Sequence, residues 1–266
     1  MRNRWFIALA AIGLHISIGS VYAWSVLTRP IMADMGFTLS QTTWTFSLAI
    51  LMLGLSAGFL GSFAEKIGPK KSGLLAMLFW VTGLFGTAYA LSVHNLTLLY
   101  LFYGIIGGIG LGIGYITPVS TLVKYFPNRP GFATGLAIMG FGFASLIAGP
   151  LMQYLVAQVG LVDTFIILGV IYLVIMGASS LYLKAPQPKL STRTTKDRST
   201  MYVHTHGMLA NDAMKTWQFG ALWWVFFINI TCGIGLLSLA SPMAQEAIGM
   251  TPAAAASLVG IIGIFN

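Results

Sequence analysis

Charged residues are scarce in this 266-residue chain, and acidic residues are the scarcest. Charged side chains make up 8% of the sequence, with six Asp and Glu in total, whereas hydrophobic residues make up 57%. A mean hydropathy of +0.84 leaves too few polar side chains to cover the surface of a soluble domain of this length. The composition therefore argues against a water-soluble globular protein and indicates one that lies in a membrane.

Cysteine and catalytic groupings are equally sparse. The single cysteine, Cys232, lies inside an apolar run and has no partner for a disulfide within the chain. No nucleophile with a base, no pair of carboxylates and no cofactor motif occurs in the apolar runs, so we expect no enzyme and no cofactor. His204 and His206 form a His-x-His pair, but further ligands nearby are missing, so we predict no metal site.

Long apolar runs dominate what is present. A helix needs about 20 apolar residues to cross about 30 Å of hydrocarbon, and seven runs are long enough. They are too long and too uniformly apolar for the alternating strands of a membrane barrel, so the sequence predicts an all-α, polytopic membrane protein. An eighth run opens at Ala253 and is too short to span before Asn266. The predicted spans cover approximately residues 5–27, 42–63, 72–91, 96–123, 131–156, 163–183 and 219–239.

Basic residues are distributed unevenly among the gaps between these runs. Thirteen of the fourteen Lys and Arg residues precede the first run or fall in every second gap, and only Arg29 falls in the other gaps. By the positive-inside rule this asymmetry predicts a multi-pass plasma-membrane protein, in a bacterial inner membrane, with a cytoplasmic N-terminus. Because the bases flank spans, we expect them to contact membrane lipid and not nucleic acid. The thirteen are Arg2, Arg4, Lys66, Lys70, Lys71, Lys124, Arg129, Lys184, Lys189, Arg193, Lys196, Arg198 and Lys215.

A polar segment divides the chain. Residues 184–215 are rich in Ser and Thr and contain Pro186 and Pro188, whereas the loops between the first six spans are short. This composition is typical of a linker. We therefore expect residues 1–183 to form an N-terminal half of six spans and residues 184–215 a cytoplasmic linker. Residues 216–266 would start a C-terminal half, with the seventh span and an incomplete eighth.

The end of the seventh span repeats the end of the first. In both places a proline, an acid, a glycine and a threonine follow one another, with one residue inserted in the second copy, and a short loop then starts the next helix. This match favours a parallel repeat of six spans, as in the two halves of major facilitator transporters. The paired residues are Pro30 with Pro242, Asp34 with Glu246, Gly36 with Gly249 and Thr38 with Thr251.

The loop after the second span carries a more specific motif. A glycine, an acid, a base, a second glycine and a basic pair follow one another as Gly61, Glu65, Lys66, Gly68, Lys70 and Lys71. The loop resembles the signature loop of the major facilitator superfamily, although Glu replaces the commoner Asp and Pro69 stands where Arg is frequent. In that family the acid helps to lock one face of the transporter closed, which implies this role for Glu65. Charge alone would also fit a solvated turn whose bases anchor lipid headgroups.

Glycine is concentrated in the fourth span. Gly104, Gly108 and Gly112 repeat at four-residue spacing on one helix face, which permits close contact with a neighbouring helix. The string also resembles a nucleotide-binding glycine fingerprint. Such a fingerprint needs a strand before it and a helix start within it, whereas these glycines lie inside an apolar helix. We therefore interpret them as packing residues.

Motifs from the first to the fifth span resemble one branch of the superfamily, the oxalate/formate antiporter family. They cover residues 19–25 (GSVYAWS), 104–118, 124–142 and a Gly149–Pro150 pair expected to pack helices. Members of that family move small carboxylates such as oxalate, formate, lactate or pyruvate. The resemblance implies an alternating-access carrier, an antiporter or a symporter, for a small carboxylate.

Four side chains are candidates for contact with the substrate. His15, Gly19 and Tyr22 share a face of the first span, and polar groups within a span usually face the bundle interior. In the resembled family, tyrosines of the first and fourth spans bind the carboxylate, which implies this role for Tyr22 and Tyr115, with Trp24 beside the first. Two alternatives stay open. Tyr22 and Trp24 could belong to the interfacial aromatic belt, and His15 could be a neutral core histidine and not a proton relay.

Cationic side chains are missing from the interior of the predicted spans, although an anion held at mid-membrane must be compensated by charge or dipoles. In the resembled family the cationic partners lie on the eighth and eleventh spans. We therefore expect half of a binding site here and a missing C-terminal half as its partner. The alternatives are a truncated product without transport activity, or a carrier of this superfamily for a sugar or a drug.

Overall fold

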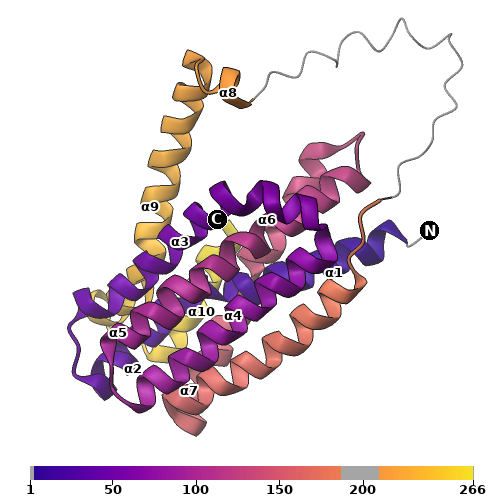
Figure 1. The fold of residues 1–266 in the computed structure, drawn as a ribbon. Coiled ribbons are helices and arrows are strands. Elements are labelled where there is room, and N and C mark those ends of the chain that lie inside the picture. The colour runs from indigo at the N-terminus through magenta and orange to yellow at the C-terminus, as the bar shows by residue number, and fades with distance from the viewer. Residues whose placement is uncertain (1–2, 187–209, 266) are drawn as a thin grey trace, which may run out of the picture. The chain divides into compact units, whose positions relative to one another are not determined.

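The computed structural model describes residues 3–186 and 210–265, and the regular structure of these residues is helical (Figure 1). Helices are expected because long apolar segments can satisfy their backbone hydrogen bonds internally only in this form. Six helical stretches in the described ranges are long and apolar enough to cross a membrane. They confirm the all-α, multi-pass architecture and cover Arg4–Met35, Leu39–Ile67, Pro69–Ser92, Leu96–Tyr125, Pro130–Tyr182 and Trp217–Ala247.

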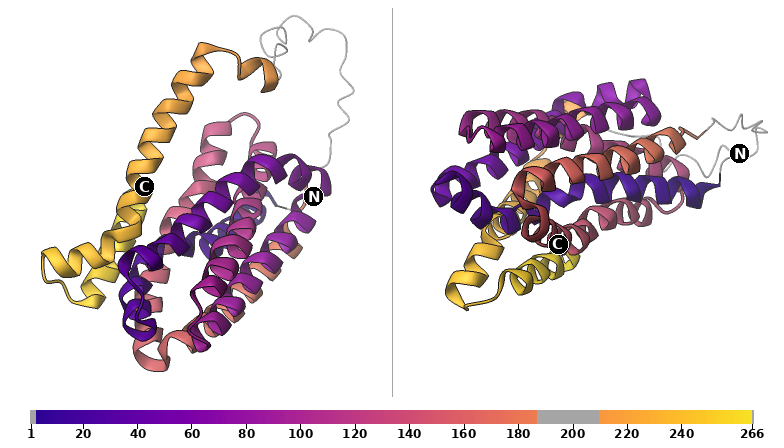
Figure 2. Two further views of the ribbon diagram at one scale, coloured as in Figure 1. Left: turned by 60° about the vertical axis from the view of Figure 1, so that its left-hand side comes forward. Right: turned by 90° about the horizontal axis from the view of Figure 1, so that it is seen from below.

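The longest stretch contains two of the predicted spans. Helix α7 (Pro130–Tyr182) has 53 residues, but Gly160 inside it has φ 81° and ψ 178°, a conformation that is not helical and that glycine adopts at low cost. Its two parts, in pink and salmon in Figure 2, run in opposite directions through the bundle. Accordingly, α7 supplies both the fifth and the sixth span.

The first span is interrupted near its middle. Helix α1 (Arg4–Gly19) passes through a 3-10 turn, η1 (Ser20–Ala23), into α2 (Trp24–Met35). The seventh span, α9 (Trp217–Ala247), resembles this arrangement at its end, because α2 and α9 each contain a proline and each is followed by a glycine with positive φ. These angles are 69° at Gly36 and 67° at Gly249, which is the left-handed geometry that terminates helices.

The threonine of each repeated segment caps the following helix. The Thr38 Oγ1 accepts a hydrogen bond of 3.3 Å from the backbone N–H three residues later, at the start of α3 (Leu39–Ile67). The Thr251 Oγ1 accepts a bond of 3.3 Å at the equivalent place in α10 (Pro252–Phe265). Both threonines satisfy a backbone donor that the helix itself leaves unpaired. The sequence repeat is therefore also a repeat of local structure.

The fourth span is composite. A single turn, α5 (Leu96–Leu99), leads into an eight-residue π-helix, η2 (Tyr100–Gly107), and then into α6 (Gly108–Tyr125). In a π-helix the backbone hydrogen bonds span five residues instead of four, and such turns are frequent at functional sites. The sequence does not predict this π-helix, since the apolar run through these residues is continuous.

Glycines bring the fourth span close to α3. A Cβ atom at Gly104 would lie 2.9 Å from the Leu48 Cβ, and one at Gly108 would lie 2.8 Å from the Ala49 carbonyl oxygen. A Cβ at Gly112 would lie 2.8 Å from the backbone nitrogen of Ala57. All three distances are shorter than ordinary van der Waals contact, so side chains there would force the two helices apart.

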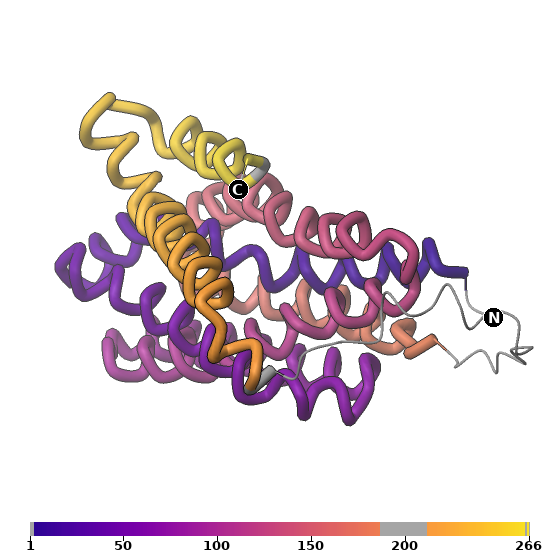
Figure 3. The backbone as a smooth tube through the Cα atoms, turned by 90° about the horizontal axis from the view of Figure 1, so that it is seen from above, coloured from indigo at the N-terminus to yellow at the C-terminus, as the bar shows by residue number. Residues whose placement is uncertain are grey.

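The chain divides into two compact units, residues 1–186 with 237–266, and residues 187–236. In the first unit α1 packs on α6 and α7, and α4 (Pro69–Ser92) packs on both of these as well. Helix α10 lies along the first part of α7 (Figure 3). In that contact a Cβ at Gly149 would lie 2.9 Å from the Ala256 carbonyl oxygen, while Pro150 is exposed.

In the second unit, the described residues form α8 (Ala210–Ala213) and the part of α9 up to residue 236, where most side chains are exposed. Most of the predicted linker, residues 184–215, lies outside the described residues. So do the predicted His204–His206 pair and several of the predicted cytoplasmic bases, namely Arg2, Lys189, Arg193, Lys196 and Arg198.

Candidate substrate site

His15 connects three spans at the centre of the first unit. The side chain is fully buried in α1. Its Nδ1 lies 2.6 Å from the carbonyl oxygen of Ala137 in α7, and its Nε2 lies 3.0 Å from the carbonyl oxygen of Tyr115 in α6. The first span is thereby tied to the fourth and to the fifth through one imidazole ring.

An aromatic ring on the fifth span gathers the predicted site residues. The Phe141 ring meets Tyr22 at 4.8 Å, Tyr115 at 5.6 Å and His15 at 6.0 Å between ring centroids, each time nearly edge to face. Tyr115 also stacks on His15 at 5.4 Å and 25°. Both tyrosines are half-buried, whereas Phe141 is buried. We call His15, Tyr22, Tyr115 and Phe141 the histidine cluster.

Two glycines permit this convergence. A Cβ at Gly140 would lie 3.1 Å from the Ile12 carbonyl oxygen and 3.2 Å from the His15 Cβ. A Cβ at Gly19 would lie 2.7 Å from the Ala144 Cβ. Side chains at these positions would push α1 away from α7 and draw the Ala137 carbonyl out of reach of His15.

The sequence did not predict a place for Phe141 in the candidate site. This residue lies within residues 124–142, which carry the family resemblance, but nothing in the sequence separates it from the other sixteen phenylalanines. One local feature does indicate a helix contact at this position. Phe141 follows Gly140 directly, and a glycine within a span indicates close approach of another helix.

Trp24 lies outside the histidine cluster. Its buried ring packs against Tyr103 of η2 at 4.3 Å, and Tyr103 in turn meets Trp80 at 5.6 Å and Phe165 at 6.2 Å. We call Trp24, Trp80, Tyr103 and Phe165 the tryptophan cluster. Tyr22 and Trp24 diverge because residues two apart on a helix do not face the same way. Full burial of Trp24 also disfavours an interfacial belt position.

An acidic residue of the signature loop forms an ion pair with a lysine at the end of another helix. Glu65, near the end of α3, lies 3.2 Å from the Lys124 ammonium near the end of α6. Both side chains are about half exposed, at 46% and 51%. The two residues belong to the same predicted half. A Cβ at Gly61 would lie 2.9 Å from the Ile116 side chain, so this glycine brings α3 against α6.

The turn of the signature loop depends on glycine. Gly68 has φ 82°, and Pro69 is the first residue of α4. At this position an N–H group would have no hydrogen-bond partner within the helix, so proline is well tolerated. The three lysines around this turn are exposed to the surroundings, as headgroup contacts require: Lys66, Lys70 and Lys71.

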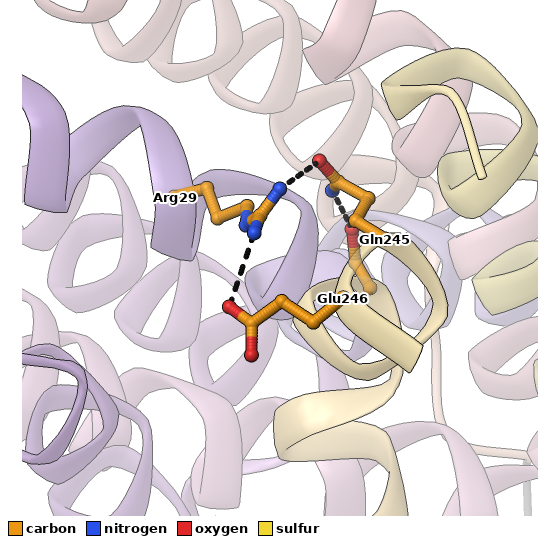
Figure 4. A network of polar contacts seen from close by, with 4 residues as sticks. Arg29, Gln245 and Glu246 are labelled. Atoms are coloured by element: carbon orange, nitrogen blue, oxygen red, sulfur yellow. Dashed lines mark hydrogen bonds and ion pairs between the residues drawn. The ribbon is translucent and has the colours of Figure 1, made fainter. Parts of the chain in front are cut away.

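A second ion pair lies at the opposite ends of the spans, where α2 meets the end of α9. The Arg29 guanidinium donates to the Glu246 carboxylate and to the Gln245 side-chain oxygen, each at 3.1 Å (Figure 4). Gln245 in turn donates to the Ser241 hydroxyl at 3.1 Å. Unlike the Glu65 pair, this contact joins the first span to the seventh and hence one repeated segment to the other.

The sequence of the chain matches the family model of the Major Facilitator Superfamily over residues 6–266. It is 30% identical over 266 residues to an uncharacterized MFS-type transporter, YhjX, of Escherichia coli K12, covering 100% of the chain and 64% of that protein. It is 24% identical over 265 residues to the oxalate:formate antiporter of Oxalobacter formigenes, covering 99% and 61%. Human monocarboxylate transporter 14 is 29% identical over 170 residues, covering 64% and 33%.

The fold is similar to that of a solved transporter. The crystal structure of a D-xylose-proton symporter matches with a TM-score of 0.67 at 14% identity, covering 98% of the chain and 66% of the symporter. At this identity the likeness concerns the fold alone. The chain spans less than two thirds of the length of each of these proteins. The family model and the named relatives are those of transporters and not of enzymes, and the chain belongs to the major facilitator superfamily of multi-pass membrane proteins.

Proposed function

We propose that the chain is part of a secondary carrier for small carboxylate anions of the oxalate, formate, lactate or pyruvate type, working by alternating access. The observation that carries this proposal is the histidine cluster, in which half-buried Tyr22 and Tyr115 converge on Phe141 from two different spans. Two relatives support the substrate class, since one is named an oxalate:formate antiporter and another a monocarboxylate transporter.

The chemistry of the proposed site rests on the two phenols. A phenolic hydroxyl donates a hydrogen bond to a carboxylate, and the ring beside it packs against a small planar anion. Neutral donors alone compensate a desolvated anion poorly, because an isolated buried ion costs several kcal/mol or more. We therefore propose that a second six-span half supplies further compensation, and that the chain by itself holds half of the site.

We propose the division into two halves and a linker that the sequence predicts. Residues 1–183 form the N-terminal half, residues 184–215 a cytoplasmic linker and residues 216–266 the start of the C-terminal half. The two ion pairs then lie at opposite mouths of the transport pathway. Arg29 closes the outer mouth between the halves, and Glu65 acts at the inner mouth in conformational control without contact to the substrate.

Substrate binding tests the proposal. The chain extended by a second half should bind one of radiolabelled oxalate, formate, lactate or pyruvate, and D-xylose should not compete. The 266-residue chain expressed alone should show no specific binding or uptake of the same four anions. Binding of radiolabelled D-xylose with no carboxylate binding would replace the proposed substrate class with sugars. Carboxylate uptake by the chain alone would contradict the half-site argument.

Orientation is tested separately, by labelling. We propose a cytoplasmic N-terminus and linker in a bacterial inner membrane, because of the 13-to-1 distribution of bases. Cys232, which is exposed, is first changed to Ser, and single cysteines are then placed in the linker. A membrane-impermeant maleimide should leave them unlabelled in intact cells and label them after permeabilisation. Labelling in intact cells would reverse the orientation.

A further inference from the structure

Both ring nitrogens of His15 face hydrogen-bond acceptors. Nδ1 lies 2.6 Å from the Ala137 carbonyl oxygen, and Nε2 lies 3.0 Å from the Tyr115 carbonyl oxygen. A neutral imidazole carries one N–H and one lone pair, so one of the two contacts would set a lone pair against a carbonyl oxygen. Only the imidazolium ion donates to both. Hydrogen bonds at both ring nitrogens therefore require a protonated ring.

Among the described residues, no group of opposite charge near the ring balances such a charge. From α6 the ionisable group that faces it is Tyr115, and from α7 the ring meets Ala137, Gly140 and Phe141, none of which ionises. Tyr22 lies further along its own span. In the part of the chain that the structure describes, no ion pair of His15 with a carboxylate occurs. Because the side chain is fully buried, an unbalanced charge would be strongly disfavoured.

The missing charges are complementary. The proposed carboxylate needs a positive charge, and the protonated ring needs a negative one. We propose that His15 binds one proton together with the anion, so that the charge of the ring and that of one carboxylate group cancel and the proton crosses with the anion; this inference rests on the proposed function. The proton adds to the ring nitrogen that carries the lone pair, no bond in the substrate breaks, and the proton leaves when the anion leaves.

Tyr115 links the two ligands. Its carbonyl oxygen accepts from Nε2, its ring stacks on the imidazole at 5.4 Å, and its hydroxyl is one of the proposed carboxylate donors. A cationic ring stacked on a phenol is favourable in itself and draws electron density from the hydroxyl, which strengthens it as a donor. Proton binding at His15 and anion binding at Tyr115 thus favour each other, and by linkage the effect is reciprocal.

The first experiment measures carboxylate affinity against pH in the reconstituted transporter that contains this chain. The probe is whichever of oxalate, formate, lactate or pyruvate binds the wild type. Its Kd should rise by about tenfold per pH unit once the ring of the free protein is neutral, as uptake of one proton per anion requires. The His15→Gln variant should bind the anion more weakly, and its Kd should no longer rise with pH. His94→Asn is the matched control and should keep the wild-type profile.

His94 is suited to this control because it is exposed and lies in a turn, where its only described ion pair is a contact of 3.8 Å to Asp34. Its φ of 51° is one that asparagine tolerates. If the His15 variant does not fold, calorimetry of the wild type in two buffers of different ionisation enthalpy still measures the proton uptake. About one proton should be taken up for each anion bound.

The second experiment observes the ring directly. Nitrogen-15 NMR of histidine-labelled protein, with the His15 signal identified from the variant, should show both ring nitrogens protonated when the anion is bound. Carboxylate binding with no proton uptake, a pH profile that His15→Gln does not alter, or a single neutral tautomer in the bound state would overturn the inference and leave the proposed function standing. Absence of any carboxylate binding would overturn both.

Discussion

Two aromatic clusters lie a few residues apart along the first span, and they differ in exposure and in polarity. The tryptophan cluster is buried, and the indole nitrogens of Trp24 and Trp80 have no hydrogen-bond partner among the described residues. The histidine cluster keeps two half-buried tyrosines and holds its imidazole between two carbonyl groups. The first arrangement is that of a packed core. The second combines a hydrogen-bonded imidazole with two phenols that are not fully buried.

The largest expected effect is a loss of stability when a side chain of the tryptophan cluster is removed. Trp80→Ala should lower the free energy of unfolding by about 3–5 kcal/mol, because it removes a buried ring and leaves a cavity. Thermal unfolding followed by helical circular dichroism measures this change in the free energy of unfolding. Trp44→Ala, at a side chain 57% exposed, is the matched control and should cost far less. Equal costs would mean that the tryptophan cluster does not behave as a core.

An intermediate effect is expected where the fourth span meets α3. Gly112→Ala should destabilise the protein by about 1–3 kcal/mol, since the new Cβ has no room beside Ala57. Gly135→Ala is the control, because a Cβ there meets nothing within 4 Å, and a gain of up to about 1 kcal/mol is expected from helix propensity. A neutral Gly112→Ala would show that the two helices do not approach as closely as described.

The smallest effects are expected from the ion pairs at the two ends. Both pairs are half exposed, so each contributes about 0–1 kcal/mol, and their removal should act on conformation more than on stability. Arg29→Gln and Glu65→Gln should shift the balance of inward-open and outward-open states in opposite directions, as read by cysteine accessibility at each mouth. Substrate affinity should change little. A large loss of affinity in Glu65→Gln would instead place this acid in the substrate site.

The fold could be predicted from the sequence because the membrane allows few structures. Span lengths, the repeated segment with Pro30 and Pro242 and the glycine face of the fourth span all follow from local patterns. The π-helix at Tyr100–Gly107 could not be predicted, since its residues are those of an ordinary apolar helix.

The arrangement of the candidate site could be predicted only in part. The predicted residues His15, Tyr22 and Tyr115 lie together, and their contact with a substrate stays a prediction. Trp24, predicted beside them, faces another cluster, and Phe141 was not singled out. The pairing of Arg29 with Glu246 joins residues 217 positions apart, and the carbonyl groups around His15 come from two other spans. Contacts of this kind depend on how helices are arranged and leave no trace in a local pattern.

The most direct test of the two-cluster account compares carboxylate affinity in three conservative variants of the transporter that contains this chain. Tyr22→Phe and Tyr115→Phe should each weaken binding by about 0.5–3 kcal/mol, as expected for a lost hydrogen bond to a charged group. Tyr103→Phe, within the tryptophan cluster, should leave the affinity unchanged. Unchanged affinity in the first two variants, or an equal loss in Tyr103→Phe, would contradict the assignment of the carboxylate to the histidine cluster.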